Sequence, residues 1–211
     1  VSNGQPELCS EGAKVGDWQP MVEAVRVYSV GLGGDSEVHF SAATGLDIGP
    51  RRVVPMCLLG QQHPWIISRL KHQYNASPNP RNNRFVMRLE SNEVLLNQLG
   101  EDERYAWEKL GEGPIELDAV VSEDRQLARS LAKLQRMGLA IYSGFTPSDA
   151  AHVLGLSDHW CRETAELAAK IWAKQIRNLY GLGNWKLGDA EAPSQQVYDL
   201  VTQNISRTLI E

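Results

Sequence analysis

Apolar and polar positions alternate over part of the first third of the chain, as they do in half-buried strands. Val38 and Phe40 each lie between polar residues, so apolar side chains recur at every second position. The wider segment 21–55 is rich in β-branched residues and is divided by glycine turns. Because Pro50 and Pro55 cannot donate a ladder hydrogen bond, the last part of this segment is expected to pair briefly or at a sheet edge.

In the rest of the chain, apolar residues mostly recur with the period of an α-helix. Leu127, Ser130, Leu131 and Leu134 form one stripe of a helix that is expected to end before Gly138. Further elements are expected in the same part of the chain: a short helix near Pro64, helices over 93–99, 102–110, 148–154, 157–180 and 194–211, and a strand at 139–142.

Small polar residues mark the expected helix starts, because their side chains accept hydrogen bonds from the free N–H groups of a first turn. Ser148 is expected to cap one helix, and Ser157 or Asp158 to open the long helix that follows. Trp160 would then lie on the buried stripe of that long helix. Ser194 is expected to cap the last helix, which has no stop signal before the final residue.

Residues 86–145 follow the order helix, turn, helix, long helix, glycine and strand, which is the order of a small winged-helix unit. Such a unit serves either as an inserted packing module or as a DNA-binding module. The long helix has mixed charge, whereas phosphate binding requires concentrated cations. The packing module is therefore the favoured interpretation.

Composition and charge narrow the class of protein. The 211 residues are 42% hydrophobic and 22% charged, which is ordinary for a globular domain. A net charge of -5 with scattered Lys and Arg argues against a nucleic-acid partner. The sequence has neither the apolar run of about 20 residues that a membrane helix needs nor a signal-peptide pattern, so a cytoplasmic protein is expected. The three widely spaced cysteines predict reduced thiols rather than a zinc site.

The sharpest local motif is a glycine-rich turn after the first β segment. Gly31, Gly33 and Gly34 are followed there by Asp35 and Ser36. Glycines permit a sharp turn and close approach of a ligand, and successive N–H groups of such a turn can bind an anion. In that interpretation Ser36 offers a hydroxyl, and Asp35 holds a metal-bound water or acts as a base. The alternative is a glycine-rich hairpin connection, and no Gly-Lys-Ser/Thr step follows that would make a P-loop.

A second motif opens the helical region at residues 144–155. Thr146 is a natural helix starter, and Asp149 in a first turn suits the helix dipole. The functional alternative places Asp149 at a helix N-terminus facing a cleft, where it would orient a metal or a polar substrate. His152 lies about one turn further on, near the same face, and is either a packing residue or a direct participant.

Four segments together resemble the hydantoinase A/oxoprolinase family, which includes N-methylhydantoinase, 5-oxoprolinase and acetone carboxylase β-type subunits. The family has a similar glycine-rich loop ending in Ser, with a third glycine in its commoner form where this chain has Asp35. The start of the second motif resembles the family's Thr-Asp-Ala helix start. The matching segments are Gly-Asp-Trp-Gln-Pro-Met-Val-Glu-Ala-Val at 16–25, Tyr-Ser-Val-Gly-Leu-Gly-Gly-Asp-Ser at 28–36, residues 45–54 with Asp-Ile-Gly-Pro, and Phe-Thr-Pro-Ser-Asp-Ala at 145–150 with Val-Leu-Gly at 153–155.

The resemblance implies a mixed α+β (α/β) fold, part of an ATPase fold of the actin, sugar-kinase and Hsp70 type. Residues 1–85 would be its β-rich part, 86–145 a winged-helix-like insertion and 146–211 the helical return. The family's phosphate-binding Asp-x-Gly-Gly-Thr hairpin and its Gly-Gly-Ala-Gly adenosine loop do not occur in the sequence. An internal fragment, inactive by itself, that retains part of the cleft wall is therefore expected.

The function that the resemblance implies is ATP-dependent hydrolysis of a cyclic amide, with Mg²⁺ neutralising the transferred phosphoryl group. Its expected site residues fall into three groups: catalytic Asp149, Asp35 and His152; cofactor-binding Gly31, Gly33, Gly34, Ser36 and Thr146; and Asp149 as metal ligand. A second, hydantoinase B-type subunit or domain and an oligomer are the expected partners. The glycine turn and the helix that opens at Thr146 are expected to converge on one pocket.

The alternative function is a non-catalytic scaffold that binds a partner subunit of a hydrolase or carboxylase. Trp18, Trp65 and the 86–145 unit are its contact candidates, because aromatic side chains are enriched in interface cores.

Overall fold

The structure is a computed structural model, and it describes residues 8–9, 24–25, 33–41, 45–90 and 93–210. The chain forms two compact units, Val1–Val30 and Gly31–Glu211. In the first unit β1 (Leu8–Cys9) pairs antiparallel with β2 (Ala24–Val25). All other described elements belong to the second unit, which combines helices with two small sheets and confirms the expected α+β class.

An antiparallel hairpin, β3 (Ser36–Ser41) and β4 (Gly45–Arg52), follows the glycine turn. Val38 is buried as expected. Its neighbour Glu37 is also buried, at 5% exposure, although the alternating pattern predicts a polar, solvated position. Ion pairs with Arg51 and Arg84 compensate for the burial of this carboxylate, which is why the pattern prediction is wrong at Glu37.

The second sheet joins distant parts of the chain in the order β5-β8-β6-β7. Its β5 strand runs parallel to β8, with Val54 opposite Ser143, and the other pairs are antiparallel. The edge position of Pro55 agrees with the expected short pairing. Its strands are β5 (Val54–Pro55), β6 (Phe85–Arg88), β7 (Ile115–Glu116) and β8 (Ala140–Gly144).

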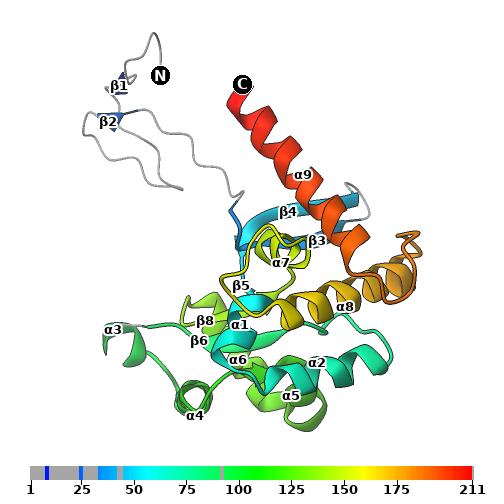
Figure 1. Cartoon of the computed structure of the whole chain (residues 1–211). Helices are drawn as coiled ribbons and strands as arrows, with labels where there is room; N and C mark the ends of the chain where they lie inside the picture. The colour runs from blue at the N-terminus through cyan, green and yellow to red at the C-terminus, as the bar shows by residue number, and fades with distance from the viewer. Residues whose placement is uncertain (1–7, 10–23, 26–32, 42–44, 91–92, 211) are drawn as a thin grey trace. The chain divides into compact units, whose positions relative to one another are not determined.

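The larger core is formed by helices that precede residues 86–145 in the sequence and by helices that follow them. Figure 1 shows α7 between the β3–β4 hairpin and α8, and residues of α7 contact both. The sequence pattern did not predict α1, and the helix expected near Pro64 begins at Ile66. The helices of this core are α1 (Met56–Gln62), α2 (Ile66–Asn75), α7 (Pro147–Val153), α8 (Arg162–Tyr180) and α9 (Glu191–Ile210).

Three helix starts differ from the expected ones. Thr146, not Ser148, caps α7, because its side chain accepts the N–H of Asp149. The long helix α8 begins at Arg162, so Trp160 precedes it. The last helix, α9, starts before Ser194, where Asp189 Oδ1 accepts the first free N–H groups, and Ser194 is buried within the helix.

A smaller core lies within residues 85–144. Trp107 and Leu110 of α4 pack with Leu131 and Leu134 of α6, as the apolar stripes predict. Gly138 follows α6 with φ at +73°, in the left-handed conformation expected of a helix-ending glycine. The helices of this core are α3 (Glu93–Leu96), α4 (Glu101–Gly111), α5 (Leu117–Glu123) and α6 (Arg125–Arg136). Of the helices described in either unit, none has the length and apolarity needed to cross a membrane.

Candidate functional site

The glycine turn and the start of α7 lie in direct contact. The N–H of Ser148 donates to the carbonyl oxygen of Gly34 at 2.9 Å. Four residues after Gly34, the N–H of Val38 in β3 donates to the carbonyl oxygen of Phe145 at 3.1 Å. Both residues of the first bond line the same cavity, so the expected convergence of the two motifs is confirmed.

A side chain at Gly34 would displace the Ser148 hydroxyl. A Cβ atom at this position would lie 2.6 Å from Ser148 Oγ, which is shorter than any ordinary carbon–oxygen contact. Within the turn, the N–H of Gly33 donates to Ser36 Oγ at 3.0 Å, and the N–H of Ser36 donates to the carbonyl oxygen of Gly33 at 3.1 Å. Ser36 is buried, so its hydroxyl, which was expected to contact a phosphate, instead stabilises the turn.

The cavity at this contact has a volume of about 620 Å³. Its polar groups come from the glycine turn, from the end of β4 and from α7, and its walls are mainly apolar. Cavities of this size, with apolar walls and a few convergent polar groups, are typical of small-molecule sites. The lining residues are Gly34, Asp35, Arg52, Val53, Val54, Pro55, Leu58, Leu89, Ile141, Ser148 and Trp160.

Asp35 and Arg52 form an ion pair at the polar part of the cavity. Asp35 Oδ2 lies 2.7 Å from Arg52 Nε and 2.5 Å from Nη2. The hydrogen bond and the negative charge of Asp35 raise the pKa of Arg52. Because the guanidinium is exposed, solvent screens the pair, and its main effect is to orient the guanidinium.

Asp149 follows Ser148 in α7 and is fully buried. Its Oδ2 accepts hydrogen bonds from Thr146 N–H at 2.9 Å, Thr146 Oγ1 at 2.8 Å and Met56 N–H at 3.2 Å. Its Oδ1 accepts the N–H of Cys57 at 2.6 Å. Burial raises the pKa of Asp149, and a hydrogen bond from the Cys57 thiol, together with the bonds above, opposes the rise. The carboxylate thereby joins the first turn of α1 to the first turn of α7.

The expected role of Asp149 as a magnesium ligand does not fit this geometry. An ionised carboxylate offers about four acceptor positions, and donors of Met56, Cys57 and Thr146 already occupy them. Asp149 is also absent from the cavity wall. In the part of the chain that the structure describes, His, Cys, Asp and Glu side chains form no group of three or more placed to hold a metal ion. The geometry fits a positioning role.

Cys57 shares the buried environment of Asp149. Burial, together with the negative charge of Asp149 and a hydrogen bond to it, raises the pKa of the Cys57 thiol. The thiol is therefore protonated at neutral pH and is a poor nucleophile. The carbonyl oxygen of Cys57 accepts the N–H of Cys161 at 3.2 Å, which connects α1 to the start of α8.

His152 is buried and does not line the cavity. Its Nδ1 lies 2.7 Å from the carbonyl oxygen of Ser148, and its Nε2 accepts the N–H of Trp160 at 3.1 Å. This pattern fits a neutral ring with its proton on Nδ1. The ring also stacks on Trp160, with centroids 5.5 Å apart and planes inclined by 7°. His152, expected to take part in catalysis, therefore holds Trp160 at the cavity wall.

The remaining expected residues do not all reach the cavity. Gly33 shapes the turn and Thr146 is buried as the helix cap, whereas Gly31 lies outside the described residues. The sequence interpretation missed Arg52 and Trp160, which carry no local motif, and it treated Ser148 only as a helix starter. Ser148 could have been found from its position beside Asp149 in the second motif.

Comparisons with protein-family models, curated proteins and solved structures found no match. The assignment of function therefore depends on the geometry of the cavity and on the motifs that form it.

Proposed function

We propose that this chain forms the substrate-binding wall of an ATP-dependent cyclic amide hydrolase of the hydantoinase/oxoprolinase type. The contact between Gly34 and Ser148 supports this proposal, because it brings the two motifs of that resemblance to one cavity. The volume of about 620 Å³ accommodates a small ring with space for a reacting group.

Ser148 is the residue best suited to bind the amide. A hydroxyl both donates and accepts hydrogen bonds, and a cyclic amide presents a carbonyl oxygen and an N–H on adjacent atoms. Arg52, oriented by Asp35, lies at the cavity wall and supplies donors for a second carbonyl oxygen of the ring. Leu58 and Trp160 provide apolar surface against which the ring packs and from which water is excluded.

The buried residues act through these groups. Asp149 fixes the first turn of α7, and with it the backbone from which Ser148 projects. Gly33, Gly34 and Ser36 set the shape of the turn that faces Ser148. These four residues are positioning residues in the proposal.

The described residues do not by themselves fit a triphosphate with its Mg²⁺ at this cavity. Arg52 is the cation of the cavity wall, and it is already paired with Asp35. The sequence also contains no Asp-x-Gly-Gly-Thr hairpin. In the proposal, ATP and Mg²⁺ are held by other residues of the active protein, which includes a hydantoinase B-type subunit or domain and works in the cytoplasm without nucleic acid or membrane.

The hairpin and the helices α7 to α9 would form part of an actin-like ATPase domain. The unit over 86–145 would be a winged-helix-like insertion. The helices α5 and α6 are adjacent and share a core with the strands β8, β6 and β7, which lie in this order in the sheet. This arrangement supports the second assignment.

Calorimetric titration of the chain with hydantoin tests the proposal. The expected result is a stoichiometric complex that Ser148→Ala weakens roughly two- to tenfold, since one hydrogen bond contributes about 0.5–1.5 kcal/mol. Ser122→Ala is the control, because the Ser122 hydroxyl is exposed on α5, does not line the cavity and bonds the main-chain carbonyl of Asp118. Absence of binding at millimolar hydantoin, or equal weakening by both variants, would refute the proposed site.

Exposed apolar side chains favour the alternative of a partner-binding scaffold. Trp65 is 46% exposed, and Val94 and Tyr105 of the 86–145 unit are 68% and 51% exposed. Trp18, the other contact candidate, lies outside the described residues. If this function holds, Trp65→Ser and Tyr105→Ser will weaken co-elution with a hydantoinase B-type subunit, while the chain shows no affinity for hydantoin.

A further inference from the structure

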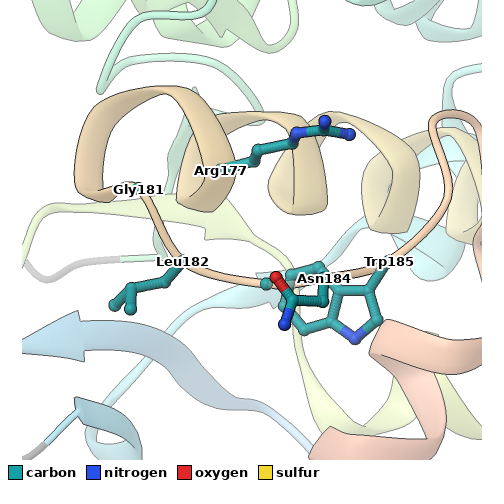
Figure 2. A pocket seen from close by; sticks show the side chains of 6 residues that line it. Arg177, Gly181, Leu182, Asn184 and Trp185 are labelled. Carbon is teal, nitrogen blue, oxygen red and sulfur yellow. The ribbon is translucent and has the colours of Figure 1, made fainter.

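A second cavity lies at the C-terminal end of α8 and shares no lining residue with the cavity at Gly34. The helix ends at Tyr180 and is capped by Gly181, where φ is +67°, and the loop after it folds back along the last turns. Figure 2 shows Arg177 on α8, with Leu182, Asn184 and Trp185 on this loop. The cavity between them has a volume of about 390 Å³.

The surface beside this cavity is positively charged. Lys170, Lys174 and Arg177 follow one another at helical spacing on α8, and Lys186 joins them from the loop. None of the residues lining the cavity and this adjoining surface is acidic, in a chain of net charge -5. The nearby Asp189 is occupied in capping α9.

Three of these cations are available to a ligand. Lys174 Nζ donates to the carbonyl oxygens of Tyr74 and Ala76, at 2.7 and 2.8 Å, and is held in place. Lys170, Arg177 and Lys186 have no side-chain hydrogen bond or ion pair with any described residue. Many other basic side chains here are ion-paired, as Arg52, Arg69, Arg81 and Arg84 are.

An aromatic surface adjoins the cations. The Trp185 ring packs over Gly183, and its centroid lies 5.6 Å from that of Trp172. A neighbouring hollow of about 320 Å³ shares the loop residues and adds the amide side chain of Gln196 to that of Asn184. A planar group placed against Trp185 would therefore find stacking surface and amide partners together.

A purely structural explanation accounts for only part of this arrangement. Cations in the last turns of a helix stabilise its dipole, which explains Lys174 and Arg177. It explains neither Lys186, which comes from the loop, nor the aromatic cavity beside it.

We propose that this cavity binds a small planar anion, with a carboxylate or phosphate group between Arg177 and Lys186 and its ring against Trp185. This site is separate from the proposed hydrolase function and does not depend on it.

Equilibrium titrations with benzoate, phenyl phosphate and inorganic phosphate test the site. Binding of benzoate or phenyl phosphate that is at least about fivefold tighter than that of inorganic phosphate supports it. Arg177→Gln should weaken both aromatic anions about fivefold or more. Trp185→Leu should weaken them to the level of inorganic phosphate, and neither variant should alter hydantoin affinity.

Arg125→Gln is the control, because Arg125 is exposed on α6 and likewise unpaired among the described residues. If it weakens binding as much as Arg177→Gln does, the anions respond only to overall charge and the proposal is overturned. Equal affinity for inorganic phosphate and the aromatic anions, or no binding of any probe, also overturns it.

Discussion

Asp149 Oδ1 accepts the backbone N–H of Cys57 at 2.6 Å, although the two residues are 92 positions apart. The other oxygen accepts the N–H of Met56 and the cap bonds of Thr146. The first N–H groups of a helix have no partner within the helix, so one carboxylate here satisfies donors of both α1 and α7. The position of Ser148 at the cavity depends on this buried junction.

Asp149→Asn is expected to lower the free energy of unfolding by about 2–4 kcal/mol. The side-chain amide keeps the size of the carboxylate but turns its own N–H donors toward N–H donors of the backbone. Chemical denaturation at neutral pH measures the loss. Asp158→Asn is the matched control, because the Asp158 side chain is 99% exposed, and it should change stability by less than about 0.5 kcal/mol. If both substitutions lower the free energy of unfolding equally, the Asp149 carboxylate does not stabilise the junction between α1 and α7.

The Cys57 thiol should make stability depend on alkaline pH. Burial and Asp149 raise its folded pKa, whereas the unfolded thiol loses its proton near pH 8.5. Above that pH the unfolded state binds fewer protons than the folded state, so stability falls as pH rises. Between about pH 8.5 and pH 10 this contribution should fall by about 1.5 kcal/mol. Chemical denaturation of the wild type and of Cys57→Ala at both pH values isolates the contribution of this thiol. Equal changes of stability with pH in the two proteins would contradict the prediction.

Gly60→Ala is expected to destabilise the protein by about 1–3 kcal/mol, although alanine favours helices. A Cβ atom at Gly60, within α1, would collide with the buried, β-branched side chain of Thr164 on α8. Gly111→Ala provides the comparison, because the nearest atom to a Cβ there is the flexible end of Arg88 at 3.1 Å. Thermal unfolding of both variants measures the difference, and a stabilised Gly60→Ala would show that α1 and α8 are not packed this closely.

Gly34→Ala should act through Ser148. The added methyl group forces the Ser148 hydroxyl out of its position, which costs about 1 kcal/mol and weakens hydantoin binding as much as Ser148→Ala does. The double variant should bind no more weakly than either single one, because both remove the same contact. Gly100→Ala, whose Cβ would meet only the end of the Glu103 side chain outside the cavity, is the control. If the losses of hydantoin affinity add up in the double variant, Gly34 and Ser148 act independently and the prediction is wrong.

Elements specified by local signals were predicted well. The Leu131 and Leu134 stripe and Gly138 located α6, and Asp149 lies in the first turn of a helix as the second motif indicates. These signals act within one or two turns of a helix, so a single segment of sequence contains them.

Features that depend on distant residues were not predicted. The burial of Glu37 requires Arg84, which is 47 positions away and immediately precedes β6 of the other sheet. The orientation of Arg52 requires Asp35 across the hairpin, a pairing that no spacing rule reveals. Trp160 was assigned to α8 by its apolar character, yet it lies before the helix because its N–H bonds His152.

The most direct test of the account follows the backbone amide signals of Gly34 and Ser148 by NMR during a hydantoin titration. The account predicts that both signals shift with the same dissociation constant, while the signals of the loop after Gly181 remain in place. If hydantoin binds and shifts neither signal, or shifts only the loop, the cavity between the glycine turn and α7 is not the substrate site.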